Sequence, residues 1–280
     1  MEKELAKKEV KITVKSLIST EQVKARFNEV LGKKSGAFLA SILSAININP
    51  SLSFCDANSV INSALVAATL DLPINQSLGF AHLVPYSGKS QFQIGWRGLV
   101  QLAIRTGQYT NIGVTEVYSD ELKSYNPITE KLNFTPEKNW LLREKENDAD
   151  VIGFFAYFSL KGGFKKSVYI TVAKAKAHGK KFSKTFETGR WKDDFAAMAK
   201  KTVLKMLLSK WGILSTEIQV AITHDQAIIG ENGELNYVDN ATVEEPIAMP
   251  KEKKKEQEND AIDDVMLGDD IPEFGEKAKK

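Results

Sequence analysis

The chain has 280 residues, of which 42% are hydrophobic, enough to bury a core in one large domain or two small ones. Its single cysteine, Cys55, excludes a framework of disulfide bonds and fits a reducing compartment. The net charge of +2 hides an asymmetry, since residues 244–280 carry 12 acidic and 7 basic side chains while residues 1–243 carry 24 and 31. A basic body with an acidic tail predicts a polyanionic partner. No apolar run is long enough to cross a bilayer, so we expect no membrane partner.

The first seventy residues predict three helices behind a flexible arm. Residues 1–18 are rich in lysine and glutamate, which is typical of a mobile terminus. Thr20 is a suitable cap for a helix over residues 19–31, where apolar side chains recur at helical spacing. Two more helices are predicted over residues 37–46 and 58–70, the first of them ending before Pro50.

The next stretch predicts a hairpin that leads into a short helix. Strands are expected over residues 79–84 and 91–94, joined by a turn at residues 85–88. The second strand alternates glutamine with apolar residues, so we expect it to be half-buried. Gly95 and Gly98 indicate a turn around Trp96 and Arg97, and the helix that follows should stop at Gly107.

The remainder predicts more strands, one long helix and a tail. Strands are expected over residues 111–118 and, within an irregular stretch, 131–134. The clearest hairpin pairs residues 151–160 with residues 164–172. Residues 190–211 form the strongest helical pattern, with Phe195, Ala199, Val203, Leu207 and Trp211 on its core side.

The expected architecture is therefore α+β: N-terminal helices, a mostly antiparallel sheet with an embedded helix, a long C-terminal helix and a disordered tail. The domain boundaries that follow are a flexible arm over residues 1–18, a core over residues 19–229 and a flexible acidic tail over residues 230–280. Within that tail, residues 246–280 are charged and poor in aromatics, which is typical of disorder.

Recognisable catalytic motifs are missing from the sequence. Gly88-Lys89-Ser90 resembles the end of a phosphate-binding loop, but a strand follows it where such a loop needs a helix. His82, His178 and His224 are scattered, and no histidine or cysteine set has the spacing of metal ligands. We therefore expect no cofactor, no metal and no enzymatic activity.

Basic residues interleaved with aromatic ones occur three times, and each set alone also fits a solvated face. On a basic body, three such sets together favour a groove for nucleic acid. Met198 is informative because it lies among cations, off the apolar side of its helix, where it can pack on a flat partner such as a base. The first set is Trp96, Arg97, Gln101 and Arg105. The second is Lys161, Lys165 and Lys166 with Tyr169, running on into Lys174, Lys176, Lys180, Lys181 and Lys184. The third is one stripe of the long helix opposite its core side, formed by Asp194, Met198, Lys201 and Lys205; Arg190, at the start of this helix, is a further candidate.

A resemblance to a known family rests on residues 72–88 and 91–107, and on the later residues Trp191, Asp194, Met198, Lys201 and Thr202. With these motifs, residues 22–212 resemble the RecT family of phage single-strand annealing recombinases. The resemblance implies an ATP-independent protein that coats single-stranded DNA, anneals complementary strands and assembles into rings or helical filaments. It also implies a phage exonuclease as partner, an annealed duplex as intermediate and the cytoplasm of a bacterial host as location.

Two other classes of function stay open at this point. A metal-dependent DNA-processing enzyme such as a nuclease would need acidic residues gathered around a metal. A structural adaptor would have no affinity for DNA. For an annealing protein, phosphate contacts and stacking suit the task better than reading base edges, because the bases must stay free to pair.

The tail carries a further candidate. Residues 268–274 resemble the acidic, phenylalanine-tipped end of bacterial single-strand binding proteins, with Ile271 and Phe274 as apolar anchors. This segment predicts docking to a host single-strand binding protein or to one of its partners. The alternative is an acidic tail that only shields the basic groove.

Overall fold

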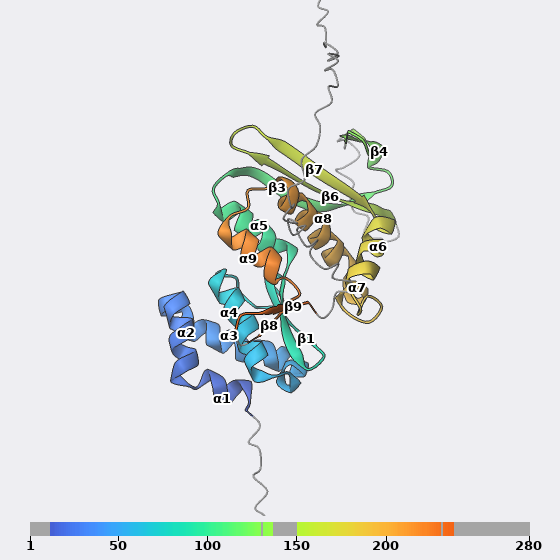
Figure 1. The fold of residues 1–280 in the computed structure, drawn as a ribbon. Helices are drawn as coiled ribbons and strands as arrows, with labels where there is room; N and C mark the ends of the chain where they lie inside the picture. Colours follow the sequence, from blue (N-terminus) through green and yellow to red (C-terminus); the bar gives the residue numbers. More distant parts are fainter. Residues whose placement is uncertain (1–11, 130, 137–149, 231, 238–280) are drawn as a thin grey trace, which may run out of the picture. The chain divides into compact units, whose positions relative to one another are not determined.

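The computed structural model describes residues 12–129, 131–136, 150–230 and 232–237 (Figure 1). It has the expected α+β character, with helices and antiparallel strands. The chain divides into two units, residues 1–243 and 244–280. The expectations for residues 246–280, Phe274 included, lie outside the described residues. Among the described residues, no helix is both long and apolar enough to cross a membrane.

The three predicted N-terminal helices are confirmed, and a fourth precedes them. Thr20 caps its helix by accepting a hydrogen bond from the Val23 amide. The flexible arm predicted over residues 1–18 is wrong near its end. A short helix forms there, its first turn is stabilised by a capping box, and the side chains of Val14 and Ile18 are buried. The elements are α1 (Val14–Ile18), α2 (Glu21–Leu31), η1 (Gly32–Lys34), α3 (Ser35–Ile48), η2 (Pro50–Phe54) and α4 (Ala57–Thr69).

The first hairpin pairs β1 (Ala81–Tyr86) with β2 (Lys89–Ile94), as predicted. Its turn is tighter than expected, because Ser87 and Gly88 both take positive φ values, which match the twist of two-residue hairpins. The half-buried character predicted for the second strand is wrong. Its glutamines are buried as well as its apolar residues, since β2 packs against α4, α9 and β8.

Helix α5 (Trp96–Arg105) begins one residue after Gly95, so Trp96 and Arg97 form its first turn and not the separate turn that we predicted. The two glycines here allow a close approach of backbones. A Cβ atom on Gly95 would lie 2.0 Å from the Gly79 carbonyl oxygen, and one on Gly98 would lie 2.2 Å from that of Phe80. The helix stops at Gly107, whose φ is +67°, as expected.

A three-stranded antiparallel sheet, in the order β3-β6-β7, forms the second half of the core. The strands predicted for it are confirmed, and Phe154, Ala156 and Phe158 are buried on one face. The strand predicted at residues 131–134 is also present, but it pairs with β4, which the sequence did not indicate. The strands are β3 (Tyr109–Tyr118), β4 (Leu122–Asn126), β5 (Lys131–Phe134), β6 (Val151–Leu160) and β7 (Lys165–Thr171).

The long helix predicted over residues 190–211 is broken in two. Asp194 leaves the helical region, with φ −147° and ψ 76°, and its carboxylate accepts a hydrogen bond from the Ala197 amide. It separates α7 (Arg190–Asp193) from α8 (Phe195–Trp211). Helix α8 packs on β6 and β7 through its buried side, but Trp211, expected on that side, is 44% exposed.

Four further elements, all after β7, were also not predicted. Helix α6 covers lysine-rich residues, and helix α9 precedes a short hairpin of β8 and β9. Strand β8 ends at residue 229, the last residue of the expected core, and its partner β9 lies in the stretch assigned to the tail. Paired structure therefore continues past the predicted boundary. The elements are α6 (Val172–Phe182), α9 (Thr216–His224), β8 (Ile228–Ile229) and β9 (Leu235–Asn236).

Candidate nucleic-acid interface

A cavity of about 230 Å³ opens between the first turn of α5, the loop before β1 and the α7–α8 junction. Its lining brings together members of two of the three basic sets, which are about a hundred residues apart in the sequence. The predicted site residues that line it are Trp96, Arg97, Arg190, Met198 and Lys201.

Backbone geometry places the two walls of the cavity. Gly95 and Gly79 also line it, and their close contact lets the amino-terminal end of α5 open into the space. On the opposite wall, the break at Asp194 ends α7 and starts α8 within the cavity lining. A continuous helix through this point, as the sequence predicted, would have left no such junction.

Trp96 is flanked by cations. The Arg97 guanidinium carbon and the Lys200 ammonium nitrogen each lie 5.3 Å from the centroid of its ring. Arg97 also donates a hydrogen bond to the Leu78 carbonyl, and Lys200 pairs with Glu116 at 2.7 Å. The indole of Trp96 therefore holds two positive groups close together at the first turn of α5.

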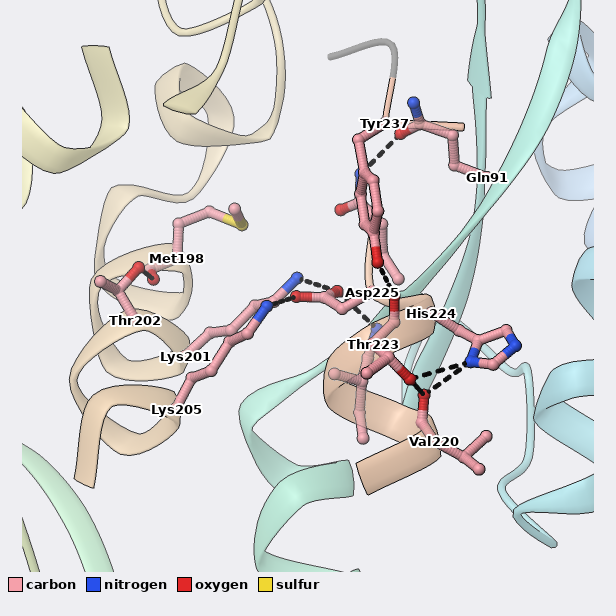
Figure 2. A network of polar contacts seen from close by, with 12 residues as sticks. Gln91, Met198, Lys201, Thr202, Lys205, Val220, Thr223, His224, Asp225 and Tyr237 are labelled. Carbon is pink, nitrogen blue, oxygen red and sulfur yellow. Dashed lines mark hydrogen bonds and ion pairs between the residues drawn. The ribbon is translucent and has the colours of Figure 1, made fainter. Parts of the chain in front are cut away.

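Behind the cavity, one carboxylate holds two lysines (Figure 2). Lys201 Nζ donates to Asp225 Oδ1 at 2.7 Å, and Lys205 Nζ donates to Oδ2 at 2.9 Å. The Ile94 amide donates to the same Oδ1 at 3.2 Å. Our expectation that the stripe of Lys201 and Lys205 faces away from the core is wrong for Lys201, whose side chain is only 7% exposed.

Sequence reasoning missed Asp225 entirely. It lies just after α9, where it is 1% exposed at its side chain. It is 24 residues from Lys201 and 131 from Ile94 in the sequence, so no local spacing connects these partners. The one available signal is a general one: a buried lysine needs an acidic partner, wherever that partner lies in the chain.

Burial and neighbouring charges shift the pKa values of three groups here. Burial raises the pKa of Asp225, but the ammonium groups of Lys201 and Lys205 outweigh it and keep that pKa below its usual range. Burial lowers the pKa of Lys201, and Asp225 acts against this shift. Burial, with Arg190 and Lys201 nearby, lowers the pKa of His82 to about 4, so this imidazole is neutral at physiological pH.

The lining of the cavity is therefore positively charged on both walls. Among the described lining residues, Arg97, Arg190 and Lys201 are cationic, while Asp194 supplies one carboxylate that already caps α8. The Nδ1 atom of His82 is buried and has no hydrogen-bond partner among the residues that the structure describes. Guanidinium and ammonium groups in a cavity lining are suited to an anion that also accepts hydrogen bonds.

The other predicted site residues lie elsewhere. Arg105 donates two hydrogen bonds of 2.7 Å to the Leu70 and Asp71 carbonyls, so it closes the end of α4. Lys205 lines an adjoining cavity of about 120 Å³ that shares Met198 and Lys201 with the first. Away from both cavities are Gln101 on α5, Lys161 in the β6–β7 turn, Lys165 and Lys166 on β7, and Lys180 and Lys181 on α6.

Several of these lysines contact rings. Lys166 lies 4.3 Å from the centroid of Trp211, and Lys181 lies 5.3 Å from that of Phe182. Lys180 lies 5.6 Å from the Phe186 ring and pairs with Glu187. The interleaving of basic and aromatic residues seen in the sequence is thus partly a set of internal cation–π contacts.

No group of three or more histidine, cysteine, aspartate or glutamate side chains in the described part of the chain could hold a metal ion. Cys55 is buried beside the end of η2, and burial raises the pKa of its thiol.

Comparison with known proteins places these features in a family. The family model described as the RecT family matches residues 36–241. The chain is 48% identical over 254 residues to YqaK, an uncharacterized protein of Bacillus subtilis (strain 168), covering 90% of this chain and 86% of that protein. It is 31% identical over 186 residues to Protein RecT of Escherichia coli (strain K12), covering 63% of this chain and 66% of that protein. The resemblance seen in the motifs is confirmed, and the chain belongs to the RecT family.

Proposed function

We propose that this chain binds single-stranded DNA and anneals complementary strands during homologous recombination, without ATP, by receiving backbone phosphates in the cationic cavity. Membership of the RecT family supports a role in single-strand annealing. The observation that carries the proposal is the convergence of Trp96, Arg97, Arg190, Met198 and Lys201 on one cavity from two distant segments.

The charges of the cavity fit this task. Two DNA strands repel each other through their phosphates, and cations that displace condensed counterions offset that cost. Arg97 and Arg190 present guanidinium groups, which match phosphate oxygens in a forked geometry. A strand held by its backbone in the cavity keeps its base edges outside, where a second strand can test them for pairing.

Trp96 and Met198 take different parts in this proposal. The Trp96 ring is already flanked by Arg97 and Lys200, so it aligns cations along the strand more than it offers a bare stacking surface. Met198 lies between the two cavities and lines both. Its flexible thioether can pack on the sugar or base that links consecutive phosphates.

The alternatives draw less support. The family match gives no support to a metal-dependent nuclease, and no group of three or more histidine, cysteine or acidic side chains among the described residues could hold a metal ion. The wider proposal includes assembly into a ring or filament, a phage exonuclease that supplies the single strand, and contact with host single-strand binding protein or its partners.

Salt titration of strand binding tests the proposal. Arg97→Gln and Arg190→Gln should each weaken binding of a labelled polythymidine and flatten the plot of log affinity against log salt by about 0.7. Lys24→Gln, which removes an exposed cation of α2 that pairs with Glu21, is the matched control and should change neither quantity. Annealing of complementary oligonucleotides should proceed in chelator without nucleotide. Wild-type affinity and slope in both folded arginine variants would refute the assignment.

A further inference from the structure

We propose that Asp225 is a positioning residue for the strand-binding cavity: it holds the Lys201 ammonium charged and fixed at the cavity wall. This inference rests on the proposed function of that cavity. It adds a buried carboxylate to a site whose proposed attraction for DNA comes from cations.

The position of Asp225 is fixed from two sides. The Ile94 amide donates to its carboxylate, and the next residue, Gln226, donates its amide to the Phe92 carbonyl at 2.9 Å. Gln226 has a φ of +67°, which turns the chain sharply at this point. The carboxylate is therefore tied to the end of β2, the segment that continues directly into Gly95 and the first turn of α5.

Through this tie, Asp225 links the two walls of the cavity. Ile94 and Gly95 belong to one wall, and Lys201 belongs to the other. The 2.7 Å contact between Lys201 and Asp225 keeps the lysine from swinging along the flexible length of its own side chain (Figure 2). A lysine without such a contact would lose part of its phosphate-binding energy to the entropy of ordering.

The charge balance around Lys201 makes the carboxylate necessary. Burial disfavours the ammonium, and Lys205 on the same helix and Arg190 on α7 repel it. His82 on β1 is neutral at physiological pH, and burial also lowers the pKa of His178 on α6, near Lys205 and Lys181. Asp194, the other carboxylate of the cavity lining, is engaged at the start of α8. Asp225 thus supplies the negative charge that Lys201 contacts directly.

Removing this charge has a distinctive consequence. In Asp225→Asn the amide keeps the shape of the side chain, but Lys201 loses its counter-ion while it stays buried beside two cations. Its pKa then falls further, so the lysine is charged only at lower pH and becomes neutral as pH rises. Strand binding, which is carried partly by this charge, should become pH-dependent in the same direction.

The test is strand affinity as a function of pH, from mildly acidic to mildly alkaline buffers at constant salt. Wild type should bind labelled polythymidine with little change. Asp225→Asn should match it at the acid end and bind roughly ten- to a hundredfold more weakly at the alkaline end, the value of one charged hydrogen bond. Asp71→Asn, which alters a half-exposed carboxylate paired with Lys34, is the matched control and should behave as wild type.

The double variant Asp225→Asn with Lys201→Gln separates this role from a merely structural one. Without Lys201 there is no buried ammonium to titrate, so affinity should be low and independent of pH. A flat profile in folded Asp225→Asn, or a pH-dependent profile that persists in the double variant, would overturn the inference.

Lysine side-chain NMR without DNA reads the same property independently. Lys201 should stay protonated in wild type across this range and should titrate at lower pH in Asp225→Asn; loss of its proton near neutral pH in wild type would overturn the inference. If Asp225→Asn does not fold, Lys205→Gln is the second variant. It removes the other lysine that binds Asp225 and a positive charge that repels Lys201, so the pKa of Lys201 must rise. Failure of wild type to bind polythymidine would refute the proposed function, while the NMR titration would still decide the role of Asp225.

Discussion

Replacing Asp225 with alanine should remove about 3–5 kcal/mol from the free energy of unfolding, the usual cost of breaking a buried ion pair from one side. The substitution leaves Lys201, 7% exposed, without its counter-ion, and it also deprives Lys205 and the Ile94 amide of their acceptor. Because domains are typically stable by only about 5–15 kcal/mol, this is a large share of the total. The melting temperature should fall by roughly 10 °C.

Urea unfolding followed by circular dichroism measures this loss. The control is Asp71→Asn, because Asp71 is half-exposed, lies 3.1 Å from Lys34, and has a φ of +46° that asparagine tolerates. Its loss should stay below about 1 kcal/mol. The pKa of Asp225 is lowered in the folded state, so its contribution is complete above the unfolded value of about 4 and disappears as pH falls through the folded value. Equal losses in the two variants would refute the reasoning.

Three further outcomes are expected. Arg105→Ala should cost about 1–3 kcal/mol, because it frees two backbone carbonyls at the end of α4, and it should leave the salt slope of strand binding unchanged; a shallower slope would place Arg105 in the interface. Gly98→Ala places a Cβ atom 2.2 Å from the Phe80 carbonyl oxygen, so it should displace α5, cost about 1–3 kcal/mol and weaken strand binding; unaltered affinity would contradict this. His82 should lower the unfolding free energy by up to roughly 3 kcal/mol between pH 6.5 and about 4, since only the unfolded state protonates it there, and His82→Gln should make the fall in a urea titration smaller by that amount.

Local signals predicted most of the fold because they act over a few residues. Thr20 caps the helix that follows it, and Gly107 ends α5 in a conformation that glycine adopts without strain. Helix α6 was missed because its lysines hide a narrow apolar stripe, although Thr171 caps it and Ala175 is fully buried. An aspartate at position 194 is compatible with the polar face of one long helix and also with the cap of a second helix. Only the tertiary structure shows that Asp194 caps α8.

In the candidate site, too, local signals predicted some features and tertiary contacts decided the others. Cations at helical spacing indicated which faces of α5 and α8 carry positive charge, and Trp96, Arg97, Met198 and Lys201 do meet at one cavity. The sequence could not show that Lys201 points inward, because its burial depends on a carboxylate that follows α9. Charge pairing over such separations leaves no periodic pattern to read.

The tie between Ile94 and Asp225 also bears on when the site comes into being during synthesis. The two residues are 131 positions apart, so the chain must close a very long loop before the carboxylate reaches β2. A nascent chain carries Arg97 and Arg190 well before Asp225 is translated, yet Lys201 has no counter-ion until then. We expect fragments that end before residue 225 to expose these cations without assembling them, and strand binding to arise only when nearly the whole core has left the ribosome.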